Sequence, residues 1–494
     1  MTDLTQLVGM TSLEAQDQRV ETEVIEPTAV SQSQCKFLLP QKGLLSEDVF
    51  FTFKATGAIP ESDFPLMAGG LSFIRRISIY YGNVLLADCD QLAHLLQLKN
   101  TFIDQDIRDQ VYQTEICHFS GLQVDTNAAG VKGMYSVAGS YDGTGVVGLT
   151  RVGNTGVGYN KDPAFRLQTD TNTTPEISLP LKACFPFLTQ TNLPLGLLNE
   201  RLTVVIDWSD DLAGVRTISN QPTVAPVVNW APGNNVDLTS CKLLLDLVYY
   251  DDKPNQPSPM ARIEARLQSG IEMVYTDYVH LEEFLPAVAP AAPTPIEQNK
   301  IIRLGLDSQI VRNILMATPK QGDYSSALPS AMSNPILGDY NSRASQGKTT
   351  LQVKINNRNI FVNALDMDAK LWNELSQVYN TPAKSNIGLT SFVGQVGGAN
   401  LALSGIQTAF PTDKNYAGHF ESNLCGSLGY LGINLSRTYD NIVSAGIAVG
   451  KSPVEIDLTY QRTAENFEKV RLLLWTENER VMLIRNGTIF VTGS

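Results

Sequence analysis

The chain contains two stretches, almost three hundred residues apart, that read nearly alike. Residues 80–90 are YYGNVLLADCD and residues 356–366 are NNRNIFVNALD. Aligned without a gap, the match places Ile77 on Val353, Ile79 on Ile355, Asn83 on Asn359, Val84 on Ile360, Leu86 on Val362, Asp90 on Asp366, Ala93 on Ala369 and Leu95 on Leu371. A gapless match of this length predicts a duplicated unit of more than two hundred residues.

The matched stretches predict a local structure that occurs once in each copy. Alternating apolar and polar residues predict a strand, and Asn beside the break predicts a turn into a second strand. Asp90 and Asp366 then precede short amphipathic segments, and we expect each aspartate to be the N-cap of a helix. Residues 77–99 and 353–375 should therefore take equivalent places as strand, turn, strand and helix in two similar domains.

The length of the chain supports two domains, and its remaining patterns are those of strands. A chain of 494 residues exceeds what one hydrophobic core serves. Each half carries about eight short apolar or alternating runs separated by Gly, Pro, Asn and Asp, with one helix and one long Gly-rich and Asn-rich loop. Eight antiparallel strands of this length pack best as a two-sheet jelly roll. The predicted fold class is all-β, with two tandem eight-stranded jelly-roll β-sandwiches, short helices and long surface loops.

These patterns also divide the chain. We expect residues 1–30 to form an N-terminal arm and residues 31–252 the first jelly roll, with a long loop at 118–172. A linker helix is expected within 253–270, ended by Gly270, and a second jelly roll at 271–494, with a long loop at 381–425. Because each loop follows the matched helix, both should leave the molecule at the same end, and the arm should lie at the opposite end.

Charge and cysteine content restrict the partners. The formal net charge is −13, which argues against a sequence-independent grip on nucleic acid, because that requires clustered Lys and Arg. The N-terminus has neither the basic nor the apolar region of a secretion signal. The six cysteines show no CxxC pair and no zinc spacing, so we expect free, buried thiols in a reducing compartment: Cys35, Cys89, Cys117, Cys184, Cys241 and Cys425.

Several motifs imitate chemical sites without meeting their requirements. GIAVGKS at 446–452 has three residues between its glycines where a phosphate-binding loop has four, and Pro453 and a strand follow where a helix is needed. Asp104, Asp106 and Arg108 begin like a calcium loop but lack its glycine and final glutamate. The glycine-rich segment 153–160 lies inside the first long loop, not between a strand and a helix.

Paired carboxylates and histidines give no firmer site. WSDD at 208–211 resembles the acid pairs of glycosidases but follows directly after a strand, where acidic residues are common. The histidines are scattered and lack metal-binding spacing: His94, His118, His280 and His419. We therefore predict no catalytic residues, no cofactor-binding residues, no metal ligands and no enzymatic activity.

Three longer stretches carry a resemblance to a known family. FPLMAGGLSFIRRISIYYGNVLLADCDQLAHLLQLKNTFIDQDIR looks like a strand, turn and helix followed by an asparagine and an arginine, here Asn100 and Arg108. EISLPLKACFPFLTQTNLPLGLLNERLTVVIDW looks like a Leu-Pro turn before an apolar run and a strand, and SPVEIDLTY like the penultimate strand of the second roll. With these stretches, the chain resembles the double jelly-roll major capsid proteins of polinton-like viruses, virophages and nucleocytoplasmic large DNA viruses.

The resemblance implies a function and partners. It implies a homotrimer whose six jelly rolls form a pseudo-hexagonal block, or capsomer, that tiles an icosahedral shell, with the long loops on its outer side. Expected partners are the chain itself, neighbouring capsomers and minor capsid or penton proteins, with no sequence-specific binding of nucleic acid. The protein would reside in the virion after assembly in the reducing interior of the host cell. The alternatives are a tandem β-sandwich that binds or cleaves carbohydrate, with Trp208, Asp210 and Asp211 as its site, and a spike or fibre protein.

Overall fold

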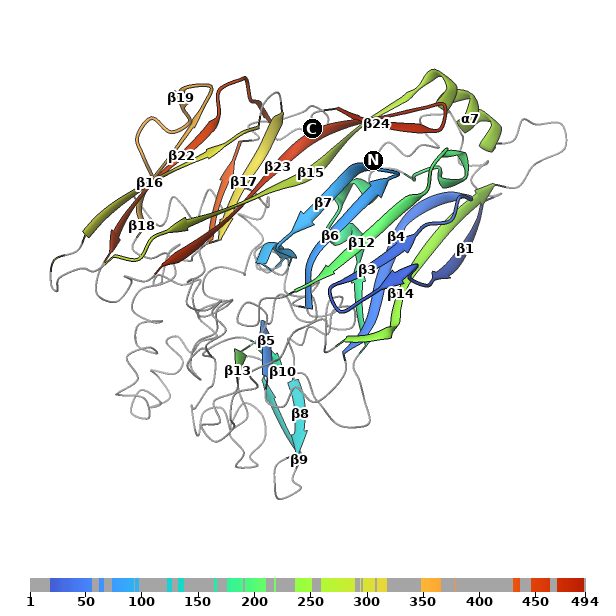
Figure 1. Cartoon of the computed structure of the whole chain (residues 1–494), viewed down its shortest axis with the longest axis horizontal. Coiled ribbons are helices and arrows are strands. Elements are labelled where there is room, and N and C mark those ends of the chain that lie inside the picture. The colour runs from blue at the N-terminus through green and yellow to red at the C-terminus, as the bar shows by residue number, and fades with distance from the viewer. Residues whose placement is uncertain are drawn as a thin grey trace.

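The strands of the chain form two β-sandwiches that lie side by side (Figure 1). The structure is a computed structural model. It describes residues 18–55, 73–96, 176–209, 236–250, 259–288, 294–317, 348–365, 430–435, 446–462 and 469–492, apart from 93, 190–191, 295 and 307–308. It also describes residue 378 and five short strands. All strand pairs in these residues are antiparallel.

The first sandwich consists of two sheets. One has the order β1 (Gln18–Ile25), β14 (Val236–Tyr250), β4 (Leu44–Ala55) and β11 (Glu176–Pro180). The other has the order β2 (Ala29–Val30), β3 (Gln34–Leu38), β12 (Leu202–Trp208), β6 (Ile74–Tyr81) and β7 (Val84–Asp90). Rings from the two sheets meet between them, since Phe37 of β3 lies 5.8 Å from Phe51 of β4, measured between ring centroids.

The second sandwich repeats this arrangement. One sheet has the order β15 (Ile271–Leu285), β23 (Val470–Arg485), β17 (Ile310–Ala317) and β20 (Tyr430–Asn434), with β21 (Ile447–Ala448) on β17 and β24 (Thr488–Thr492) on β23. The other has the order β16 (Ile296–Leu304), β22 (Val454–Arg462), β18 (Lys348–Ile355) and β19 (Arg358–Asn359).

The sheet orders establish that the two halves share one topology. Taken in chain order, the eight principal strands of each half are β1, β3, β4, β6, β7, β11, β12 and β14, and β15, β16, β17, β18, β19, β20, β22 and β23. In both halves, the first, eighth, third and sixth strands form one sheet, and the second, seventh, fourth and fifth form the other. This is the jelly-roll arrangement. The predicted fold class and the duplication are confirmed.

The duplication holds with a shift of two residues. In the first half, Tyr81 pairs with Val84 across the turn at residues 82–83, whereas in the second half Ile355 pairs with Arg358 across Asn356 and Asn357. The equivalent of Val353 is therefore Ile79, not Ile77 as the gapless alignment gave. Side chains alternate between the faces of a strand with a period of two, so a shift of two residues preserves every apolar match. Sequence comparison alone could not detect it.

The helix after the first matched strand begins one residue later than predicted. The Asp90 carboxylate accepts a hydrogen bond from the backbone N–H of Gln91 (2.8 Å). The Gln91 carbonyl accepts hydrogen bonds from the backbone N–H groups of His94 and Leu95, both at 3.1 Å. Gln91 therefore occupies the N-cap position of the helix. The corresponding segment after Asp366 lies outside the described residues.

The first sheet also begins earlier than predicted. The arm predicted at residues 1–30 contains Gln18–Ile25, which pairs with β14 along its whole length. Its charged residues conceal the strand pattern, because the half-buried positions of this edge strand include Glu21 and Glu23, paired with Arg19 and Lys42, while valines are exposed. The predicted linker helix is α7 (Pro259–Ser269), and Gly270 follows it with φ +94° as its C-terminal cap.

Three connections of the first sandwich meet at one of its ends. β5 (Ser62–Pro65) pairs with β10 (Ala164–Arg166) and β13 (Thr217–Ile218), and β8 (Leu122–Thr126) pairs with β9 (Lys132–Ser136). These strands lie at the end remote from α7 and β24 (Figure 1). The rest of the loop predicted at 118–172, and the whole loop predicted at 381–425, lie outside the described residues.

A tight turn joins the sandwiches at the α7 end. Asn486 and Gly487 link β23 to β24, with φ values of +48° and +74°. The Tyr81 hydroxyl and the Asn199 backbone N–H of the first sandwich both donate to the Gly487 carbonyl, each at 2.8 Å. Gly487 is needed here because a Cβ atom at this position would lie 2.6 Å from the Leu197 carbonyl oxygen.

We expect Gly487→Ala to destabilise the protein by about 2 kcal/mol, because the left-handed conformation and the contact with Leu197 both oppose a side chain. Gly305→Ala is the matched control, since a Cβ atom there meets nothing within 4 Å. Differential scanning calorimetry should give a lower melting temperature for the first variant and an unchanged or slightly higher one for the second. Equal melting temperatures would contradict the role assigned to this turn.

Candidate functional site: the junction between the two sandwiches

The junction is built on an edge strand whose backbone is satisfied by side chains from the other sandwich. β7 is the last strand of its sheet and, among the described strands, pairs only with β6. An edge strand leaves hydrogen-bonding groups at alternate residues pointing away from its sheet. Side chains of the second sandwich form hydrogen bonds with the backbone of three such residues of β7, namely Leu86, Asp88 and Asp90.

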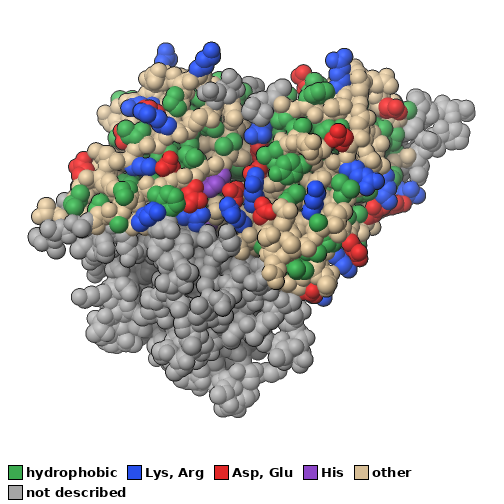
Figure 2. Space-filling view, in the orientation of Figure 1, with side chains coloured by type: hydrophobic (Ala, Val, Ile, Leu, Met, Phe, Trp, Pro, Cys, Tyr) green, Lys and Arg blue, Asp and Glu red, His purple; other side chains and the backbone are tan. Residues whose placement is uncertain are grey.

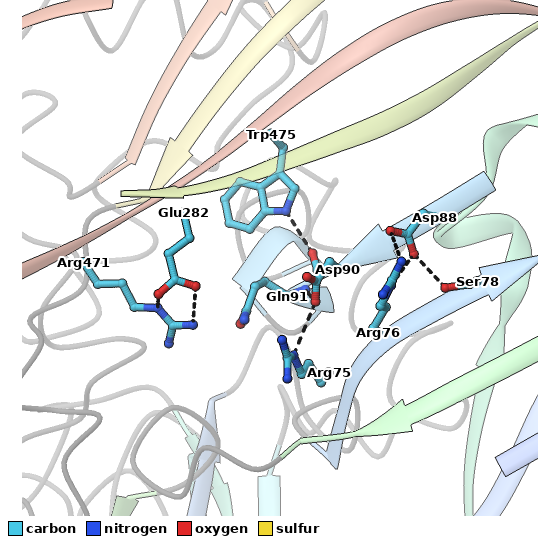
Figure 3. Close-up of polar contacts among 9 residues, drawn as sticks. All are labelled: Arg75, Arg76, Ser78, Asp88, Asp90, Gln91, Glu282, Arg471 and Trp475. Atoms are coloured by element: carbon cyan, nitrogen blue, oxygen red, sulfur yellow. Dashed lines mark hydrogen bonds and ion pairs between the residues drawn. The ribbon is translucent and has the colours of Figure 1, made fainter. Parts of the chain in front are cut away.

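Each of these contacts uses a different side chain. The Tyr275 hydroxyl donates to the Leu86 carbonyl (2.7 Å). The Asp277 carboxylate accepts from the Asp88 N–H (3.1 Å). The Trp475 indole N–H donates to the Asp90 carbonyl (2.9 Å; Figure 3). Tyr275 and Asp277 lie on β15 and Trp475 on the neighbouring β23, so the second sandwich satisfies the edge without adding a strand to it.

A buried ion pair lies beside this edge. The Asp277 side chain is 1% exposed, and its Oδ2 lies 3.2 Å from Nη1 of Arg480. Burial raises the pKa of Asp277 from 3.8 to about 6, although Arg480 and the N–H of Asp88 oppose the shift. The ionised carboxylate is thus held in the junction at neutral pH at an energetic cost.

The outward side chains of β6 and β7 tie the edge to its own sheet. Arg76 donates two hydrogen bonds to the Asp88 carboxylate, at 2.7 and 2.9 Å, and Ser78 donates a third at 2.8 Å (Figure 3). The hydrogen bonds with Asp88 raise the pKa of Arg76 above its usual value. Asp88 is therefore fixed through its side chain to β6 and through its backbone to Asp277.

The junction also contains two histidines that the sequence left apart. The His280 ring lies 5.3 Å from the Trp475 ring, and its Nδ1 is 2.9 Å from the Leu474 carbonyl. His94 is buried near His280 and Arg471, and burial lowers the pKa of both histidines. Burial therefore favours the neutral form of both imidazoles. Among the described residues, no three His, Cys, Asp or Glu side chains are grouped to hold a metal ion.

Apolar packing makes the junction continuous with the first core. Tyr275 lies edge-on to Phe187, with ring centroids 5.6 Å apart. The cluster of buried residues that fills the first sandwich extends into Leu315, Ala317 and Leu473 of the second, whereas Ile314, Met316 and Leu474 belong to the separate core of the second sandwich. β17 and β23 are thus buried on both faces. The sequence signal was the unbroken apolar run LLLW at 472–475, which alternation alone does not explain.

The motifs weighed from the sequence lie elsewhere. Trp208 is a core residue, 5.9 Å from the Phe51 ring and 5.3 Å from the Phe53 ring, and Asp210 and Asp211 lie outside the described residues. GIAVGKS is followed by Pro453 and β22, as predicted, and its Gly450 N–H donates to the Asn356 side chain (2.7 Å). Residues 104–108 and 153–160 lie outside the described residues.

The cysteines that the structure describes are free and buried, as predicted: Cys35, Cys89, Cys184 and Cys241. Cys117 and Cys425 lie outside that part of the chain. No helix in the described residues has the length and hydrophobicity to span a membrane.

We expect Tyr275→Phe and Trp475→Phe each to lower the free energy of unfolding by about 1–3 kcal/mol, because each leaves a buried carbonyl of β7 without its donor. The loss of indole packing adds to the cost at position 475. The measurement is thermal unfolding followed by calorimetry. Tyr80→Phe, at a half-buried position on β6, is the control and should change stability by less than either variant.

The Asp277 carboxyl should give the protein a pH dependence of defined sign. Its pKa is higher in the folded protein, about 6, than the ordinary value of 3.8. Its stabilising contribution is therefore present below about pH 4 and is lost as the pH rises through about 6. A difference of two pKa units corresponds to roughly 3 kcal/mol.

We test this with Asp277→Asn, which cannot titrate. Melting temperatures of both proteins should be recorded from pH 4 to pH 8. The stability of the natural protein relative to the variant should fall as the pH rises from about 4 to 7. Parallel pH profiles would contradict the shift assigned to Asp277.

Comparison with known proteins gives a similar fold and no similar sequence. No protein-family model and no curated protein matches the chain. Among solved structures, VP54 of the virus PBCV-1 matches with a TM-score of 0.55 and 11% identity, covering 96% of both chains. A chain of the Sputnik virophage matches with a TM-score of 0.52 and 14% identity, covering 96% of this chain and 88% of that one.

The Faustovirus major capsid protein matches with a TM-score of 0.52 and 9% identity, covering 94% of this chain and 90% of its own. The similarity extends over both sandwiches in each case, because neither half alone could give such coverage. The chain therefore has the two-domain fold of these proteins from end to end.

Proposed function

We propose that the chain is a major capsid protein that assembles into homotrimers, and that these pseudo-hexagonal capsomers tile an icosahedral viral shell. The observation that carries the proposal is the match of the complete double jelly roll to VP54, over 96% of both chains. A chance likeness between β-sandwiches would cover one domain; here two rolls and their order are shared.

The internal construction supports a role as a building block. The two rolls are held together by a buried junction, so that one chain supplies two similar units in a fixed relative position. The anchoring strands of both predicted loops also point to the same side. Ala317 pairs with Leu473 and Tyr430 at the end of the second sandwich remote from α7, and Lys54 pairs with Glu176 at the corresponding end of the first.

The proposed partners follow from this role. They are other copies of the chain within a trimer, neighbouring capsomers, and minor capsid or penton proteins. The net charge of −13 favours no direct grip on nucleic acid. Lys and Arg are interspersed with Asp and Glu across the visible face of the described sandwiches (Figure 2). We place the protein in the virion shell, after assembly in the reducing interior of the host cell, where its buried thiols stay free.

The carbohydrate alternative is less well supported. A sugar site presents an aromatic ring on which the sugar stacks, but Trp208 is 4% exposed and packs against Phe51 and Phe53. Its indole N–H donates to the Ser31 carbonyl (3.3 Å), which fixes the ring in the core. The shell role requires no catalytic group, and we propose that the protein is not an enzyme.

We expect the purified protein to be a trimer of about 160 kDa, three times 54.0 kDa, because a closed ring of this kind buries on the order of 2,000 Å² or more per interface. Gel filtration with light scattering at micromolar concentration measures the mass. Reductant should leave it unchanged, since no disulfide is expected in the interface. A monomer under both conditions would overturn the proposal.

A further inference from the structure

The junction inside one chain has two unused counterparts on the same chain. Inside the chain, β7, the fifth principal strand of the first roll, meets β15, the first strand of the second roll. By the shared sheet order, the fifth strand of the second roll is β19 and the first strand of the first roll is β1. Among the described strands, each of these two pairs on one side only, β19 with β18 and β1 with β14.

The β1 edge has the properties of a covered surface. Val20 and Val24 lie on one face of β1 and are 53% and 52% exposed. Exposed valines on an unprotected edge strand favour association with another chain. Thr22 lies between them on the same face, whereas Glu21 and Glu23 lie on the opposite face, in ion pairs with Arg19 and Lys42.

The β19 edge also presents an exposed apolar residue. Val362 follows this strand and is 96% exposed, the highest exposure of the large apolar residues that are described as exposed. Phe361, which precedes it, is held against β18 by two hydrogen bonds with the Gln352 side chain, at 2.9 and 3.3 Å. Both edges thus present exposed valines beside strands that, among the described residues, pair on one side only.

We propose that the β1 edge of one copy binds the β19 edge of a second copy, around Val20 and Val362. This interface repeats between chains the junction that β15 and β7 form within one chain. The inference rests on the proposed trimer and names the surfaces that form it. Because β1 and β19 are different surfaces, the contact is head-to-tail, and contacts of that kind close into rings when the rotation per copy allows it.

The pseudo-symmetry makes the second copy the fitting occupant. One chain contains one complete junction, between β7 and β15. It also carries a second edge of the β7 kind, at β19, and a second edge of the β15 kind, at β1. Joining the halves of successive copies gives every jelly roll in the ring the same two neighbours. A different protein that bound both edges would need an edge like β19 to bind β1 and an edge like β15 to bind β19.

Engineered cysteines test this arrangement. Val20→Cys and Val362→Cys should be made singly and together, and the trimers treated with a mild oxidant or a short bismaleimide. The double variant should give covalent dimers and trimers on non-reducing gels. A mixture of the two single variants, dissociated and reassembled together, should give covalent dimers. Neither single variant alone should give more cross-linked product than the protein of natural sequence under the same treatment.

Each other outcome is decisive. Dimers from Val20→Cys alone would mean that β1 meets β1 in a two-fold contact, and would overturn the proposal. A trimer confirmed by light scattering that shows no cross-link in the double variant would overturn it while leaving the capsid role intact. A monomer by light scattering would reject the capsid role itself.

A second measurement avoids cross-linking chemistry. Val20→Asp and Val362→Asp should each weaken self-association by about tenfold or more, because each places a charge in a buried contact. Val274→Asp is the matched control, since Val274 is 59% exposed and belongs to neither edge. Sedimentation velocity over a range of concentrations measures the dissociation, and equal weakening by all three variants would contradict the assignment of the surfaces.

Discussion

The architecture depends on how the open edge of one sheet is satisfied. A jelly roll is not a closed barrel, so its sheets end in strands with unpaired backbone groups. At β7 these groups are met by a tyrosine hydroxyl, an aspartate and an indole N–H at three alternate residues. Because each partner is a side chain, the second roll does not extend the sheet of the first. It lies against that sheet as a separate sandwich with its own core, and the two remain distinct but fixed units.

This arrangement imposes a second requirement on the sheet that faces β7. Strands β17 and β23 must be apolar toward their own core, through Ile314 and Leu474, and toward the first roll, through Leu315 and Leu473. Because the second roll packs a face of this sheet against the first roll, β17 and β23 are buried on both faces, and their sequences do not alternate. The same contact holds the Asp277–Arg480 pair in a dry environment, where the carboxyl loses most of its preference for ionisation.

The alternating residue pattern was sufficient to predict the fold class and the duplication, because burial of one sheet face imposes alternation and the turns are rich in Gly and Asn. It failed by two residues in aligning Ile77 with Val353, since the strand period is two. It missed β1 because the acidic residues of an edge strand look like those of an arm. The junction was beyond reach, because Tyr275, Asp277 and Trp475 are ordinary strand residues until a second sheet edge is placed beside them. His94 and His280 likewise come together only through the packing of the two rolls.

The difference between the two rolls has a physical consequence. In the first roll, the fifth strand is seven residues long and its edge is used within the chain. In the second, the fifth strand is reduced to Arg358–Asn359, and residues 360–365 continue along β18 mainly through the Leu351–Leu365 bridge and the bond from Ile360 N–H to the Val353 carbonyl (2.8 Å). A long regular edge exposed to solvent would pair with any strand that it met. A short, irregular edge offers few backbone groups to such a strand, so it favours only a partner of matching shape and limits indiscriminate aggregation.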